Sequence, residues 1–151
     1  MKKKLLSACV ALTFGVGAGY ASSVLAQAKP DVLVKQRQSA MTLISKYFGP
    51  VAAMAQGKAP YDGAVAMRNA AYLETLSKMP WDGFNASTKD EKNTKALPAI
   101  YENEAKFKEA QDRFTGAVAK LASAKDEAAI KGAAGELGKA CGACHNDFRA
   151  K

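Results

Sequence analysis

The sequence has few of the side chains that carry metal or redox chemistry. It contains one histidine and three cysteines among 151 residues. A structural zinc site uses four cysteine or histidine ligands, and only three such residues lie outside the N-terminal leader described below. A single histidine also excludes a metal held by two histidines of the same chain. Any metal chemistry that uses cysteine or histidine therefore has to come from one small group of residues.

The chain also lacks an apolar run long enough for a membrane anchor. Residues 5–19 are apolar and small, but glycines interrupt them, whereas a transmembrane helix needs about 20 apolar residues. MKKK before this run and AQA at 26–28 after it are typical of a secretory signal peptide. A lipoprotein cleaved before Cys9 is a competing interpretation, but no adequate apolar region lies upstream of that cysteine. We predict a cleaved signal peptide over 1–28, a mature domain over 29–151, a periplasmic location in a bacterium and no stable membrane association.

Clustered charge is absent as well. Lysine and arginine total 22 against 14 aspartates and glutamates, but the lysines are spread along every segment and alternate with acidic residues. A nucleic-acid-binding protein collects its basic residues on one face. The sequence therefore predicts no nucleic-acid partner, and its mildly basic character favours acidic partners.

Alternation of β-branched residues, which indicates strands, is missing, and apolar residues recur at helical spacing instead. This periodicity predicts four helices, over about 31–56, 61–78, 98–124 and 126–149. The connections are short except for the segment 80–97. Four helices of this length pack naturally as an antiparallel up-down-up-down bundle, so the expected fold class is all-α. Pro50 is expected to kink the first helix.

The expected buried faces follow from the same spacing. In the second helix, the face consists of Val65, Asn69, Tyr72, Leu73 and Leu76. In the third, Ile100, Phe107, Phe114 and Leu121 recur every seven residues, which is typical of a bundle seam.

The sequence CGACH at 141–145 holds the only histidine and both cysteines outside the leader. C-x-x-C-H is the attachment sequence for c-type haem. Residues three and four apart share a helix face, so Cys141, Cys144 and His145 point the same way. The thiols can then add to the haem vinyl groups while His145 binds the iron. A thioredoxin-type pair is the main rival, but it needs the N-terminus of a helix to lower a thiol pKa, and this motif ends a helix.

The sixth iron position is left to Met41, solvent, a gas or nothing. In an up-down-up-down bundle, the first helix starts at the end where the fourth finishes, so Met41 and His145 lie at similar heights. Met41 can equally be a core residue on an apolar stripe. Arg37, one turn earlier on the same face, can neutralise a haem propionate or be an ordinary solvated side chain.

Five segments resemble the class II c-type cytochromes, and most closely the cytochrome c′ family. They are RQSAM at 37–41, APYDG at 59–63, PWDGF at 80–84, ALPAIY at 96–101 and KACGACHNDFR at 139–149. The place of CGACH near the C-terminus is itself distinctive of this family. The resemblance covers the whole chain after the leader.

The resemblance implies roles for individual residues. Cys141 and Cys144 are expected to hold one haem c through thioethers, with His145 as the proximal ligand. Met41 matches a residue that shields the sixth position in cytochrome c′ and binds iron in low-spin members of the family. The other expected haem-pocket residues are Arg37, Gln38, Trp81, Thr94 and Arg149, of which Arg37, Gln38 and Thr94 match propionate contacts and Arg149 matches a basic residue beside the proximal imidazole.

The function implied by the resemblance is not enzymatic. The first hypothesis is a five-coordinate haem protein that binds NO or CO, transfers electrons with small redox proteins, or does both. The alternative is a low-spin carrier ligated by His145 and Met41. A peroxidase needs a distal acid or base, and the first helix offers only Arg37 and Gln38 near Met41. The family often forms homodimers through the first two helices, for which Tyr47 and Val51 are candidate contacts.

Overall fold

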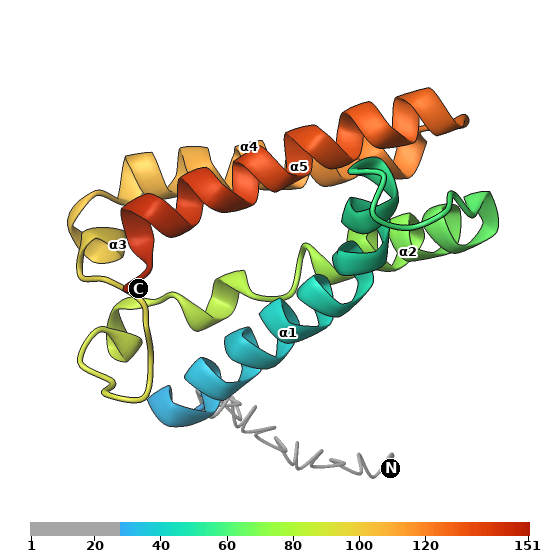
Figure 1. The fold of residues 1–151 in the computed structure, drawn as a ribbon. Coiled ribbons are helices and arrows are strands. Elements are labelled where there is room, and N and C mark those ends of the chain that lie inside the picture. Colours follow the sequence, from blue (N-terminus) through green and yellow to red (C-terminus); the bar gives the residue numbers. More distant parts are fainter. Residues whose placement is uncertain (1–27) are drawn as a thin grey trace, which may run out of the picture.

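The computed structural model describes residues 28–151, in which long helices run alternately in opposite directions (Figure 1). The long helices are α1 (Pro30–Ala55), α2 (Gly63–Leu76), α4 (Glu104–Ser123) and α5 (Glu127–Phe148). Between α2 and α4 lie two 3₁₀ turns, η1 (Trp81–Gly83) and η2 (Ala86–Thr88), and the one-turn helix α3 (Ala99–Glu102). This part of the chain contains no strand, and the all-α bundle predicted from the periodicity is confirmed.

The predicted signal peptide falls almost entirely outside the described residues, which begin at position 28. Within residues 28–151, none of the helices combines the length and the apolar character that a membrane crossing requires.

Local signals at the helix N-termini explain where the helices begin. The side chains of Asp62 and Asp126 accept hydrogen bonds from the backbone N–H groups of Val65, at 3.0 Å, and Ala129, at 2.8 Å. Each carboxylate thereby satisfies one of the amide groups that the first turn of a helix leaves unpaired. Pro30 occupies the first position of α1, where its missing N–H costs nothing.

The seven-residue repeat predicted for the third helix lies in the core. Ile100, Phe107, Phe114 and Leu121 are all at most 7% exposed. The core has two parts: a main cluster that includes Leu73 and Leu137, and a smaller cluster formed by Ile100, Phe107, Ala110 and Phe148 at the C-terminal end of α5.

Two details of the expected helices are wrong. The helix expected from Pro98 onward breaks at Asn103, whose φ and ψ of −129° and 58° separate α3 from α4. The repeat could not reveal this break because Ile100 and Phe107 stand on either side of it and are both buried. Tyr72 was expected inside but is 45% exposed, and its ring packs edge-on against Tyr47 with ring centroids 4.9 Å apart.

Pro50 interrupts the hydrogen bonding of α1 without ending the helix. Proline has no N–H to donate to the carbonyl of the preceding turn, and Figure 1 shows the axis of α1 bending in its last turns. Next to this proline, the buried Asn69 of α2 donates from Nδ2 to the carbonyl oxygen of Tyr47 at 3.1 Å. The Asn69 side chain of α2 thus supports the backbone of α1 close to the kink.

The long connection after α2 is tied to α1 and to the C-terminal end of α5. Gln38 of α1 donates from Nε2 to the carbonyl oxygen of Asn93 at 2.8 Å. On the other side, Leu97 N donates to Phe148 O at 3.0 Å and Ala150 N donates to Lys95 O at 2.8 Å. The connection therefore bridges the N-terminal half of α1 and the C-terminal turn of α5.

Candidate functional site

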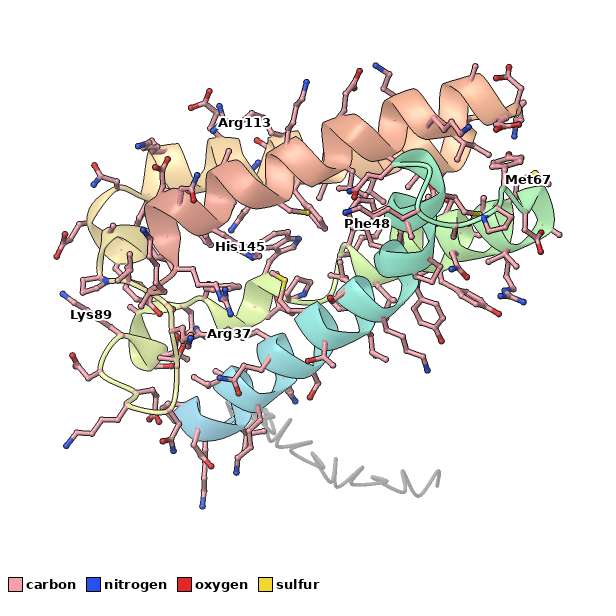
Figure 2. All side chains as sticks on the ribbon, in the orientation of Figure 1. Arg37, Phe48, Met67, Lys89, Arg113 and His145 are labelled. Carbon is pink, nitrogen blue, oxygen red and sulfur yellow. The ribbon has the colours of Figure 1, made fainter. Side chains whose placement is uncertain are left out.

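A cavity of about 660 Å³ opens between the N-terminal half of α1 and the C-terminal half of α5. Its lining consists of Arg37, Gln38, Met41, Thr42, Ser45, Trp81, Phe84, Thr94, Lys95, Ala96, Ile100, Phe107, Cys144, His145, Phe148 and Arg149. Figure 2 shows the His145 side chain pointing from α5 into the space between α5 and α1, whereas Arg113 of α4 points outward. The volume lies within the range of about 300–1,000 Å³ that is usual for cofactor sites.

The last turns of α5 supply the soft ligands of this cavity. Cys144 and His145 line it, and Cys141, one turn earlier, packs against the main core cluster instead. Both thiols are free and half-buried. All three residues lie within the last turns of α5, which is consistent with the prediction that they share one helix face. Cys141 itself, however, does not line the cavity.

Burial changes the acid–base properties of all three residues. Partial burial, reinforced by the positive charge of Arg149, lowers the pKa of His145 below its usual value. Burial raises the pKa of the Cys141 thiol, and Cys144 adds to this effect. Burial also raises the pKa of Cys144, helped by Asp147 and opposed by Arg113. Low dielectric surroundings disfavour charged forms, so the shift favours the neutral imidazole, whose lone pair can bind a metal.

Arg37 is a buried cation on the α1 wall of the cavity, with only 3% of its surface exposed. Its Nη1 donates to Gly83 O and to Thr88 Oγ1, the latter at 3.0 Å, and its Nη2 donates to Thr94 Oγ1 at 2.8 Å. Its guanidinium carbon also lies 4.5 Å from the ring centroid of Phe84. None of the ion pairs within residues 28–151 includes Arg37.

The remaining α1 residues of the cavity form a partly polar edge. Met41 is half-buried and also packs against the main core cluster, so it is both a core residue and a cavity residue. Gln38 lines the cavity while its amide holds Asn93. Thr42 and Ser45 lie beside Met41 on the same helix and are exposed.

The inner wall of the cavity is aromatic. Trp81 packs edge-on against Phe107 and Phe114, with centroid distances of 6.4 and 5.8 Å. Its indole Nε1 donates to Ser77 O at 2.7 Å, which leaves the ring itself as an apolar surface. The rest of the wall comes from Phe84, Ile100 and Phe148.

The loop side of the cavity holds the last predicted residues. Thr94 lines the cavity, and its hydroxyl accepts from both Arg37 and Ala96 N, the second at 3.0 Å. Arg149 lines it next to Lys95, because an isolated antiparallel bridge joins Ala96 to Arg149. The structure thus brings together every predicted site residue except Cys141 around one cavity.

Sequence reasoning missed part of the lining. Ser45 follows Met41 by four positions and Thr42 follows Gln38 by four, a spacing that could have placed each on the helix face of its earlier partner. Phe107 was expected in the bundle seam, but no sequence pattern showed that Phe84, Phe107 and Phe148, which come from three different segments, line one cavity.

The cavity suits a large planar cofactor better than a bare metal ion. No group of three or more His, Cys, Asp or Glu side chains within residues 28–151 is arranged to hold a metal ion. The aromatic wall matches an apolar ring, and the buried charge of Arg37 lacks the anionic partner that a buried charge ordinarily has. The residues present fit haem, which offers an apolar ring, bound iron and carboxylates.

Comparisons with known proteins agree with this donor set. The family model described as Cytochrome C′ matches residues 32–149. The cytochrome c′ of Rubrivivax gelatinosus is 49% identical over 126 residues, which cover 82% of this chain and 98% of the relative. The crystal structure of that protein superposes with a TM-score of 0.78 over 81% of this chain and 98% of its own. A nitric oxide complex of a cytochrome c prime variant from Alcaligenes xylosoxidans has a TM-score of 0.74 and 38% identity, over 82% of this chain and 98% of that one.

The match extends over nearly all of the described residues and over almost the full length of these relatives. The resemblance noted in five segments is therefore confirmed, as is the expectation of a covalently bound haem. The chain belongs to the cytochrome c′ family, and its cofactor is covalently attached haem c.

Proposed function

We propose that this chain is a periplasmic cytochrome c′ in which Cys141 and Cys144 hold the haem, His145 is the single axial ligand, and the open iron position binds NO or CO. The observation that carries the proposal is one cavity that receives Cys144 and His145 from α5 and Met41 from α1. Bound haem iron supplies reversible binding of diatomic gases and one-electron chemistry.

The α5 residues suit the proximal role. The surroundings of His145 lower its pKa and so favour the neutral imidazole, whose ring nitrogen can donate a lone pair to iron. Arg149 lies one turn later, lines the same cavity and contributes to the lowered pKa of His145. The two thiols stand three residues apart on one helix, and neither is in a disulfide.

Arg37 suits the carboxylates of haem. A guanidinium has five N–H groups and accepts no hydrogen bond. Three of them are used by Gly83, Thr88 and Thr94, which leaves two for an anionic group. Charge-assisted bonds of this kind are stronger than those between neutral groups, so Arg37 stabilises a propionate and the propionate supplies the missing negative charge.

Met41 suits the role of a cover over the open side of the haem. It packs against the main core and lines the cavity, so its side chain is held beside the open side of the haem. Gas binding is supported by the similarity to cytochrome c prime structures that contain nitric oxide. Electron exchange with small redox proteins accompanies gas binding in this proposal.

A low-spin carrier ligated by His145 and Met41 is the second candidate. The observation that favours it is the presence of the Met41 thioether in the same cavity as His145. The resting ferric protein distinguishes the two functions by its absorption and electron paramagnetic resonance spectra. A high-spin signal is expected for a single axial histidine, and a purely low-spin signal assigns the sixth position to Met41.

The proposed assembly is a homodimer through α1 and α2. Every large apolar side chain that is strongly exposed within residues 28–151 belongs to α1, to α2 or to the turn after α2: Val32, Leu43, Met67, Tyr72 and Met79. Burial of such side chains against a second copy is favourable. Tyr47 is half-buried beside Tyr72 and remains a candidate contact, whereas Val51 is fully buried within its own chain and is not.

A further inference from the structure

Thr88 is a fully buried polar residue that stands behind the wall of the cavity. Its exposed fraction is 0%, and it does not line the cavity. Four polar groups surround its hydroxyl oxygen: Arg37 Nη1 at 3.0 Å, Tyr101 Oη at 2.9 Å, Asn85 O at 2.8 Å and Gly83 O at 3.2 Å. One hydroxyl thus connects α1, the segment from η1 to η2, and α3.

The donor and acceptor roles at this hydroxyl follow from the chemistry of its neighbours. A threonine hydroxyl has one proton to donate and two lone pairs to accept with. Arg37 can only donate, so one lone pair of Thr88 accepts from it. The carbonyls of Asn85 and Gly83 can only accept, so the proton of Thr88 goes to them. Tyr101 then donates to the remaining lone pair, and the hydroxyl has no capacity left.

The same neighbours restrict where the guanidinium of Arg37 can lie. Its Nη1 is held by Gly83 O and Thr88, both of which belong to the segment from η1 to η2. Its Nη2 bonds Thr94, which does line the cavity. Thr88 therefore holds one side of the guanidinium in the protein interior, and the other side remains beside the cavity.

We propose that Thr88 is a positioning residue that holds the Arg37 guanidinium against the cavity wall and thereby sets the positive charge that the haem experiences. This inference rests on the proposed haem site. A nearby cation disfavours the additional positive charge of ferric haem, because like charges repel strongly where water is excluded. If Arg37 moves away from the cavity, the reduction potential falls.

The test uses Thr88→Val, which keeps the shape of the side chain and removes the hydroxyl, and Thr88→Ser, which keeps the hydroxyl. Thr115→Val is the matched control, because Thr115 of α4 bonds only backbone carbonyls, those of Gln111 and Asp112, and lies outside the cavity lining. The midpoint potential of the haem-loaded protein is measured for the wild type and for the three variants. We expect a lower potential in Thr88→Val, and a potential close to that of wild type in Thr88→Ser and Thr115→Val.

A measurement on the wild-type protein covers the case in which Thr88→Val does not fold. Nitrogen-15 NMR of arginine-labelled protein reports whether the two Nη atoms of Arg37 are distinct, as expected for a guanidinium held on both sides, or averaged by rotation. Averaged signals overturn the proposal. An unchanged or higher potential in folded Thr88→Val also overturns it, because a purely structural Thr88 lowers thermal stability without moving the potential.

A separate experiment tests the proposed haem site. The wild-type protein is exported in a host that produces haem c, denatured and analysed by mass spectrometry. If the proposed haem site is wrong, the protein carries no covalently bound haem. The NMR measurement on Arg37 does not depend on that outcome, so it still decides whether Thr88 holds the guanidinium.

Discussion

Gly83 packs so closely against Arg37 that a Cβ atom on the glycine would lie 2.7 Å from the Cβ of the arginine. It would also lie 2.8 Å from the backbone oxygen of Leu33, which cannot move without disturbing α1. Only glycine allows this approach, and the approach brings Gly83 O within reach of the guanidinium. The contact fixes where the segment from η1 to η2 meets α1, and therefore where one wall of the cavity stands.

Gly83→Ala should destabilise the protein by about 1–3 kcal/mol, the usual effect of overpacking a buried site. The free energy of unfolding in urea measures the effect. Gly116→Ala is the control, because Gly116 lies in α4 and a Cβ added to it would meet open space. That substitution is expected to stabilise the helix by about 0.5–1 kcal/mol. Equal effects of the two substitutions would show that the close approach at Gly83 is unimportant.

Arg37→Met should loosen the attachment of the segment between η1 and α3 to α1, leaving the bond from Gln38 to Asn93 in place. The substitution removes three hydrogen bonds of a charged donor, each worth about 1.5–3 kcal/mol. We expect faster amide hydrogen exchange at Thr88 and Ala96, measured residue by residue. Lys35→Met is the control, since Lys35 is exposed on the same helix and pairs only with Asp31. Exchange rates that match the control would contradict the anchoring role of Arg37.

Asn69→Ala should destabilise the bundle by about 1–3 kcal/mol, because the buried hydrogen bond from Asn69 to the carbonyl of Tyr47 is lost. Thermal or urea unfolding measures the change. Gln36→Ala, an exposed amide on α1, serves as the control and should change stability by less than about 0.5 kcal/mol. Asn69 Oδ1 has no hydrogen-bond partner among the described residues, so the loss should come from the Nδ2 side alone. A neutral Asn69→Ala would contradict this account of the Pro50 kink.

The thioether assignment predicts a graded loss of covalent haem. Cys141→Ser and Cys144→Ser should each leave one thioether, whereas the double substitution should leave haem that denaturation removes. Mass spectrometry of denatured protein distinguishes these states. The assignment fails if the double variant retains covalent haem.

The dimer proposal predicts that a charge on the exposed apolar surface of α1 separates the subunits. Leu43→Glu places a carboxylate where the leucine is 40% exposed. Burial of that carboxylate against a second copy is unfavourable. Analytical ultracentrifugation should show at least a tenfold weaker association than wild type. Lys108→Glu on α4 is the control and should leave the association unchanged. A monomeric wild-type protein would rule out the dimer.

The helices and the soft ligands could be predicted because both depend on residues that are close in sequence. The repeat from Ile100 to Leu121 marks a helix face within one segment, and CGACH places its ligands within five residues. The break at Asn103 escaped detection because the buried pattern continues across it. A one-residue departure from helical geometry leaves no trace in a seven-residue repeat.

The network around Arg37 could not be predicted for a different physical reason. Its bonds to Gly83, Thr88 and Thr94 span 46 to 57 positions of sequence, and the connecting segment has no regular period. Position 37 could be placed on the cavity side of its helix, which the structure bears out. Its hydrogen-bond partners depend on the tertiary fold, and Thr88 therefore carried no signal in the sequence.

The central claim is that His145 is the only protein ligand on the haem iron and that Met41 covers the other side without binding it. The most direct test is the absorption spectrum of the ferrous protein before and after addition of CO, with Met41→Ala measured in parallel. The account predicts a high-spin ferrous spectrum that changes strongly with CO, and faster CO binding when Met41 is shortened. A low-spin ferrous spectrum that CO barely alters, and that loses its low-spin character in Met41→Ala, would contradict the account.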